Sequence, residues 1–144
     1  MNAVFGVSVT VLSLIAWVGQ SLTLLAPTLA AKLGLTEPEA DVDPAFYADG
    51  RGEALWDAIT LWVMPAAGIL MVLNSKWWPL FGLVGGAVYV YFAGRGIATR
   101  VLMNRRGIRV GKTCTLTVNC IFLMLWGLSG MAMIGAAFLA YRAH

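Results

Sequence analysis

Two acidic and two basic residues are the features of this sequence best suited to chemistry. Glu53 and Asp57 are spaced i, i+4, which places both carboxylates on one face of a helix. Arg95 and Arg100 lie further along the chain, after a turn at Lys76. Arginine binds phosphate or carboxylate through paired N–H groups, and a buried carboxylate can relay protons. The four side chains therefore indicate anion binding or proton transfer.

The spacing around Lys76 predicts how the four side chains pair. Asp57 and Arg95 are equally far from Lys76 along the chain, on either side of it, so an antiparallel helical hairpin puts them at one depth. Glu53 and Arg100 are also almost equally far from Lys76. We expect two stacked ion pairs, Asp57 with Arg95 and Glu53 with Arg100. Static pairs that fix the register of the helices and a ligand-binding cluster both fit this pattern.

The chain has long apolar segments, and uncharged polar side chains lie in the same half of these segments as the four charged residues. A charge deep in hydrocarbon costs at least about 2.5 kcal/mol, so such groups should face inward and pair. We expect a polar pocket open to the cytoplasm, with Tyr91 at its floor. Its other predicted lining residues are Gln20, Thr23, Thr60, Thr99, Thr117 and Asn119.

The composition places these residues in a membrane protein. Of the 144 residues, 60% are hydrophobic and 12% are charged, and the mean hydropathy is +0.79. A soluble domain is about half apolar and about a quarter charged, whereas a membrane helix needs about 20 mostly apolar residues. The chain therefore has room for four membrane helices and no soluble domain. We expect an all-α four-helix bundle that forms one membrane domain over residues 1–144.

Four apolar segments predict the helices, at about residues 3–31, 54–75, 77–103 and 113–141. Pro27 is expected to be tolerated inside the first helix, and Pro65 is expected to kink the second. In the third, Gly82 and Gly86 have the small-xxx-small spacing that allows membrane helices to pack closely.

The segment between the first two predicted helices is acidic and carries two helix-start signals. Thr36 and Glu39 have the spacing of a capping box, and Asp43 followed by Pro44 is typical of a helix N-terminus. A short surface helix is expected there. Acidic residues alternate from 37 to 43, but the turn glycine and closing glutamate of a calcium loop are missing, which favours a solvated loop.

Basic residues concentrate on one side of the predicted membrane. The opposite side has only Lys76 and Arg142. Because basic residues favour the cytoplasmic side, we expect a bacterial inner-membrane protein with both long loops cytoplasmic and both termini outside. The acidic first loop and the basic third loop would then share a surface, where they can pair or attract anionic lipid. The residues on that side are Lys32, Arg51, Arg95, Arg100, Arg105, Arg106, Arg109 and Lys112.

Other kinds of site have little support. Cys114 and Cys120 lack the CxxC spacing of metal or redox sites, and both are expected in the core. No metal ligands, catalytic residues or nucleic-acid partner are predicted, and the lack of an intramembrane histidine argues against haem. A quinone or lipid needs only an apolar slot with a few polar contacts, so these remain the candidate ligands.

The sequence also resembles a known family. Gly94, Arg95 and Gly96 near the end of the third helix, the basic loop and the long final helix are similar in layout to the DoxX-like small four-helix bacterial membrane proteins. The resemblance covers residues 54–141, while the segment 51–57 is not placed in the family pattern. Most members have no assigned activity, and some are described as subunits of quinone-linked oxidoreductases. The resemblance therefore implies a multi-pass membrane protein, with an accessory role as one expectation.

Three hypotheses for function follow from these features. The first is a non-catalytic accessory or scaffold subunit that associates with itself or with a larger membrane complex through its glycine-rich third helix. The second is a protein that binds or transports a small anion, a lipid headgroup or a quinone in the polar pocket. The third, an enzyme with Glu53 or Asp57 as base, lacks an identified electrophile or nucleophile. We expect no catalytic activity and a membrane lipid, including anionic lipid, as partner.

Overall fold

The computed structural model describes residues 2–142 and is all-α over this range. Within it, four helical segments are long and apolar enough to cross a membrane: Ala3–Leu25, Pro44–Val72, Trp78–Arg105 and Thr113–Arg142. The chain is therefore a small polytopic membrane protein, as its composition predicts. The elements in chain order are α1 (Asn2–Leu25), α2 (Pro27–Lys32), the 3-10 turn η1 (Glu39–Asp41), α3 (Pro44–Thr60), α4 (Val63–Val72), α5 (Trp78–Arg105) and α6 (Thr113–Arg142).

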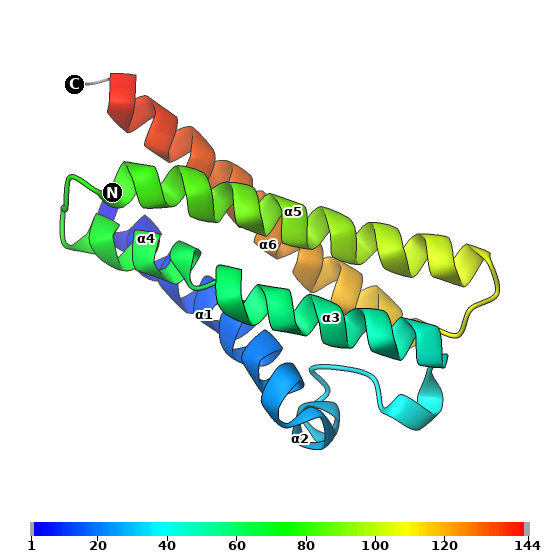
Figure 1. Ribbon diagram of the computed structural model, residues 1–144. Coiled ribbons are helices and arrows are strands. Elements are labelled where there is room, and N and C mark those ends of the chain that lie inside the picture. Colours follow the sequence, from blue (N-terminus) through cyan, green and yellow to red (C-terminus); the bar gives the residue numbers. More distant parts are fainter. Residues whose placement is uncertain (1, 143–144) are drawn as a thin grey trace.

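The two long connections lie at the same end of the bundle. Figure 1 shows the segment between α2 and α3, in cyan, and the segment between α5 and α6, in yellow, together at one end. The short turn between α4 and α5 lies at the other end, beside both chain termini. We call these the loop end and the hairpin end. This arrangement confirms the predicted placement of both long loops on one side.

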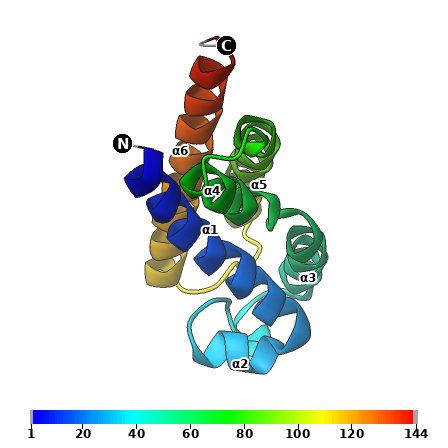
Figure 2. The ribbon, with the colours of Figure 1, turned by 90° about the vertical axis from the view of Figure 1, so that its left-hand side faces the viewer.

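Pro27 ends the first helix, so the prediction of one helix over residues 3–31 is wrong. A proline has no N–H to donate to the carbonyl four residues earlier, and it forces the preceding residue out of the helical region. Ala26 accordingly has φ −139° and ψ 66°, and the short α2 starts afresh at Pro27. The turn carries the chain away from the α1 axis at the loop end (Figure 2).

The second membrane-spanning segment begins earlier and is less straight than predicted. Asp43 caps α3 by accepting a hydrogen bond from the backbone N–H of Ala45 at 2.9 Å, so the helix starts at Pro44 and not at residue 54. The separate surface helix and the capping box at Thr36 are wrong, because only the turn η1 forms there, without a side-chain cap. Pro65 produces the expected break one turn earlier, where α3 ends and α4 begins.

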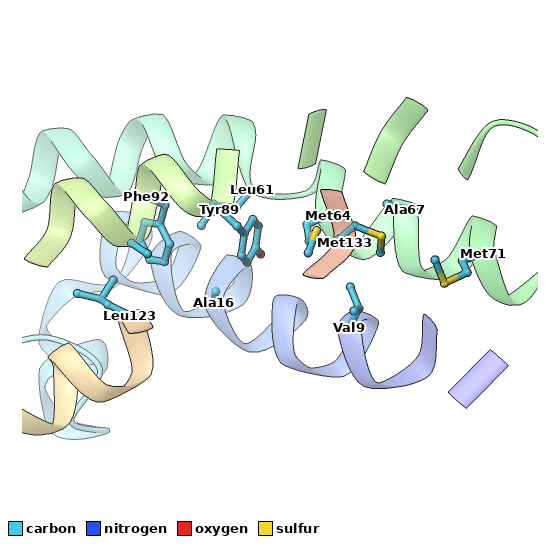
Figure 3. Close-up of a cluster of buried hydrophobic side chains, with 11 residues drawn as sticks. Val9, Ala16, Leu61, Met64, Ala67, Met71, Tyr89, Phe92, Leu123 and Met133 are labelled. Atoms are coloured by element: carbon cyan, nitrogen blue, oxygen red, sulfur yellow. The ribbon is translucent and has the colours of Figure 1, made fainter. Parts of the chain in front are cut away.

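The glycines of α5 bring its neighbours into backbone contact. A Cβ on Gly85 would lie 2.8 Å from the Cα of Met64 in α4, and one on Gly86 would lie 2.7 Å from the carbonyl oxygen of Gly130 in α6. α5 therefore packs tightly between these two helices, as the small-xxx-small spacing predicts. Buried side chains from all four spans fill the space around this contact, including the fully buried Tyr89 (Figure 3).

Three aromatic side chains hydrogen-bond α1 to its neighbours. The Tyr89 hydroxyl of α5 donates to the carbonyl oxygen of Ser13 at 2.8 Å. The Trp126 indole N–H of α6 donates to the carbonyl oxygen of Leu12 at 2.9 Å, and the Trp17 indole N–H of α1 donates to that of Ala58 in α3 at 2.9 Å. Inside a membrane such bonds satisfy polar groups that water cannot reach, so they fix α1 against α3, α5 and α6.

The acidic and basic loops meet at the loop end. The backbone N–H of Asp43 donates to the carbonyl oxygen of Arg109 at 2.8 Å, and Lys112 Nζ lies 3.9 Å from Asp41 Oδ2. The buried Glu37 side chain lies against Gly111, whose φ of +105° suits a residue without a side chain. The two loops therefore contact each other, which is one of the two possibilities that the sequence left open.

Candidate functional site

The predicted polar cluster is divided between two sides of α5. Arg95 and Arg100 are five residues apart, which at about 100° per residue places them about 140° apart around the helix. Arg95 faces the middle of α3, whereas Arg100 lies in a recess beside α1 and α6 and contacts Phe46 near the start of α3. The predicted single pocket is therefore divided into two recesses, which adjoin a common polar vestibule at the loop end.

The first recess lies between α3 and α5, and we call it the α3/α5 crevice. The part beside Arg95 has a volume of about 320 Å³. Tyr91 is 61% exposed, so it flanks the opening of the crevice and does not form the floor. The crevice holds five of the predicted site residues, Glu53, Asp57, Thr60, Tyr91 and Arg95, together with Gly52, Trp56, Ala87, Val88 and Phe92.

Arg95 is paired with two carboxylates of α3. Its Nη2 donates to Asp49 Oδ1 at 2.7 Å, and its Nη1 lies 3.0 Å from Glu53 Oε1. The second contact is an ion pair whose N–H direction does not meet hydrogen-bond geometry. The predicted pairs of Asp57 with Arg95 and of Glu53 with Arg100 are both wrong.

The break between α3 and α4 explains why the predicted pairs fail. Counting residues from Lys76 assumes one straight helix back to Asp57, but α4 packs on both α1 and α5, while α3 packs mainly on α1. Residues of α3 and α5 that are equally far from Lys76 along the chain therefore do not lie at the same depth in the bundle. Arg95 consequently reaches acids one and two turns nearer the loop end than Asp57. Asp49 continues the i, i+4 series of Glu53 and Asp57, a signal that sequence reasoning could have used.

Asp57 is left without a partner. Only 4% of its surface is exposed, and it forms no ion pair within 4.0 Å among the described residues. Its Oδ2 atom has no hydrogen-bond partner in this range. A buried carboxylate without a counter-charge is costly inside a membrane span. Asp57 is therefore the group in the α3/α5 crevice that gains most from a bound ligand.

Arg100 has spare donors on the other side of α5. Its Nη1 donates to the carbonyl oxygen of Gly96, one turn earlier in the same helix, at 3.0 Å. Its guanidinium carbon lies 5.8 Å from the centre of the Phe46 ring of α3, which holds the group in place through a cation–π contact. Within residues 2–142 it joins no salt bridge, although a guanidinium has five N–H donors.

The second recess lies beside Arg100, and we call it the α1/α6 cleft. Its volume is about 150 Å³. Arg100, Gln20 and Asn119 supply its polar groups, and an apolar wall extends from them to Trp126. An apolar chain with a polar or anionic head fits this combination. The wall residues are Ile15, Ala16, Gly19, Gly34, Leu35, Phe92, Val118, Phe122, Leu123 and Trp126.

A small polar vestibule of about 50 Å³ adjoins both recesses at the loop end. Its polar lining is Gln20, Thr23, Thr36, Tyr47, Arg51, Glu53 and Arg100. Arg51 donates to the carbonyl oxygen of Thr23, which has no N–H partner four residues later because that residue is Pro27. This structural role of Arg51 was not predicted from the sequence. The absence of a backbone N–H at Pro27 already indicated that the carbonyl oxygen of Thr23 needs another donor.

The remaining predicted residues lie apart from these recesses. Thr99 is half-buried and lines neither recess, and the exposed Thr117 donates to the carbonyl oxygen of Thr113 in its own helix. Cys114 is exposed, so its assignment to the core is wrong, while Cys120 is half-buried. Within residues 2–142, no group of three His, Cys, Asp or Glu side chains is placed to hold a metal ion.

The fold and the composition define the class, a polytopic membrane protein built as an all-α bundle. Comparisons with protein-family models, with curated proteins and with solved structures find no match to this chain. The two recesses are therefore the features of the structure that bear on its function.

Proposed function

We propose that this protein binds an acidic phospholipid in the α1/α6 cleft, with the lipid phosphate on Arg100. The observation that supports the proposal most is the guanidinium of Arg100, which has spare N–H donors and stands at the polar end of an apolar cleft. Arginine binds phosphate through two parallel N–H groups, and Gln20 and Asn119 add amide donors beside it.

The depth of the cleft matches the geometry of a lipid. Asn119 lies six residues into α6, roughly 9 Å from the start of the helix at 1.5 Å per residue, and Trp126 lies about 10 Å further. The polar residues thus lie towards the loop end, where headgroups reside, and the apolar wall follows the direction of an acyl chain. α1 and α6 contact each other little, so the cleft can receive a chain laterally from the bilayer.

A quinone is the competing occupant of the same cleft. Its carbonyl oxygens would accept hydrogen bonds from the amides of Gln20 and Asn119, and its ring would lie against Phe122 and Trp126. The unpaired positive charge of Arg100 favours the phospholipid, because a neutral quinone does not compensate it.

An accessory-subunit role draws less support from the glycines of α5 than the sequence suggested. Gly82 lies against Met133 and Ala137 of α6, and Gly85 and Gly86 contact α4 and α6 within this chain. The close-packing surface formed by these three glycines is thus occupied within the chain, and Gly94 is the one glycine of α5 that lies open. We therefore rank lipid binding above a purely accessory role.

The test is a lipid titration of delipidated protein in a neutral detergent, followed by native mass spectrometry. Phosphatidylglycerol, phosphatidylcholine and decylubiquinone serve as the three probes. We expect one phosphatidylglycerol per chain and at least about tenfold weaker binding in Arg100→Ala. Arg100→Lys should recover part of the affinity, because lysine keeps the positive charge but lacks the two parallel N–H groups of the guanidinium. Equal affinity for phosphatidylcholine would contradict the proposal. Preferential binding of decylubiquinone would show that the cleft binds a quinone instead.

We further propose that the loop end faces the cytoplasm. Its concentration of basic residues supports this orientation. Cys114 is exposed at the start of α6, whereas Cys120 lies deeper in the span, so Cys114 reports the side of the loop end. A membrane-impermeant maleimide should label the protein only after host spheroplasts are permeabilised, and not at all in Cys114→Ser. Labelling of Cys114 in intact spheroplasts would show that the loop end faces the outside of the cell.

A further inference from the structure

We propose that the α3/α5 crevice binds an organic monovalent cation with an apolar body, and that Asp57 is its counter-ion. This site lies on the other side of α5 from the proposed lipid cleft, which it meets only at Phe92 and the polar vestibule, and it has the opposite charge preference. The two proposals can therefore fail independently.

The charges around the crevice do not balance. Asp49, Glu53 and Asp57 are spaced one turn apart on α3 and face one arginine. Arg95 is engaged by Asp49 at 2.7 Å and by Glu53 at 3.0 Å, and it forms no ion pair with Asp57. Asp57 is therefore the acidic side chain of this series that is left to pair with an incoming cation.

Asp57 is also the carboxylate least able to rely on water. Only 4% of its surface is exposed, and its buried Oδ2 has no hydrogen-bond partner among the described residues. Inside a membrane span, a bound cation removes much of the cost of that buried charge. Asp57 thus points to a ligand, and not to a further internal ion pair.

The walls of the crevice suit an organic cation. Trp56, Tyr91 and Phe92 line it beside the carboxylates, and aromatic rings attract cations through their faces. Trp56 is 60% exposed and Tyr91 is 61% exposed, so both rings flank the opening and are not buried in the core. A volume of about 320 Å³ is within the range of small-molecule sites.

The same features argue against a bare metal ion. Metal sites bring several oxygen, nitrogen or sulfur ligands around one point, and no such group occurs within residues 2–142. The guanidinium of Arg95 beside the crevice repels a divalent ion more strongly than a monovalent one. α3 and α5 contact each other little, so an apolar cation can enter laterally from the membrane.

The experiment measures binding of tritiated tetraphenylphosphonium to the purified chain in dodecyl maltoside by equilibrium dialysis. The wild type should bind one cation per chain, and the neutral analogue triphenylphosphine oxide should not compete. Asp57→Asn should weaken binding at least about tenfold, since a charged partner is lost at constant shape. It should still fold, because it removes an unpaired buried charge.

Two further variants make the result specific. Trp56→Leu, at an exposed position, should weaken binding about threefold through loss of the cation–π contact. Glu39→Gln removes one negative charge from the exposed turn η1, outside the crevice, and should leave binding unchanged. Wild-type affinity in Asp57→Asn, equal weakening in Glu39→Gln, or no binding by the wild type would each overturn the proposal.

Discussion

Arg95 and Arg100 are the same residue type, five positions apart on one helix, and their surroundings differ completely. Arg95 is enclosed by Asp49 and Glu53 of α3. Arg100 has one carbonyl and one aromatic ring as its neighbours, and its other donors face a recess. The comparison teaches that the helix face, and not the residue type, decides whether an intramembrane arginine holds the fold together or is free for a ligand.

The physical basis of the difference is the number of carboxylates within reach. A buried ion pair recovers its desolvation cost only when partners and geometry are complete, and then removal of one partner is far more damaging than replacement of both. An arginine without a carboxylate keeps its binding capacity, but contributes less to stability. The two arginines should therefore respond in opposite ways to substitution.

The largest effect is expected from Arg95→Ala. This change leaves Asp49 and the more buried Glu53 without their counter-charge, next to the unpaired Asp57, and should lower the free energy of unfolding by about 2 kcal/mol. Thermal unfolding in detergent, followed by size-exclusion chromatography of the soluble fraction, measures it. Arg100→Ala, assayed in parallel, should change stability by less than about 1 kcal/mol.

A double substitution sharpens this result. Glu53→Met combined with Arg95→Met removes both charges and keeps apolar volume, so it should be less destabilising than Arg95→Ala alone. If the double variant is as unstable as the sum of Arg95→Met and Glu53→Met measured singly, the two side chains do not act as a pair. The structural role of Arg95 would then rest on Asp49 alone.

A smaller effect, on binding only, is expected when the α1/α6 cleft is filled. Gly19 lines the cleft, and a Cβ there would meet no atom within 4 Å, so Gly19→Leu fits without disturbing the helices. It should weaken phosphatidylglycerol binding about threefold to tenfold by occupying the space of the acyl chain. Gly94→Leu, at an equally open position of α5, is the matched control and should bind normally. Equal affinities for the two variants would place the lipid elsewhere.

The membrane class and the four spans could be predicted from the sequence because they depend on apolar run length, which is local. The ends of α5 and α6 agree with the prediction to within two residues. The first two spans agree less well, since Pro27 and Pro65 act through backbone groups four residues away and not at their own positions. Asp43 also starts the second membrane segment, where the sequence predicts a separate surface helix.

The candidate site was harder to predict than the fold. The residue types were found, but their pairing depended on the path of α3 before the break that precedes α4, which no residue count contains. The separation of Arg95 from Arg100 was available from the helical period alone. The roles of Phe46 beside Arg100, and of Tyr89 and Trp126 as hydrogen-bond donors to α1, required the packed structure.

The most direct test of the different roles of the two arginines is the amount of phosphatidylglycerol that co-purifies with two variants in mild detergent. One is Arg100→Ala, and the other is the combined Glu53→Met and Arg95→Met change, which removes the other arginine together with the more buried of its two partners. Lipid should be lost from Arg100→Ala and kept by the combined variant, with both still folded. Retention in Arg100→Ala, or equal loss from both, would contradict the assignment of binding to the Arg100 side of α5.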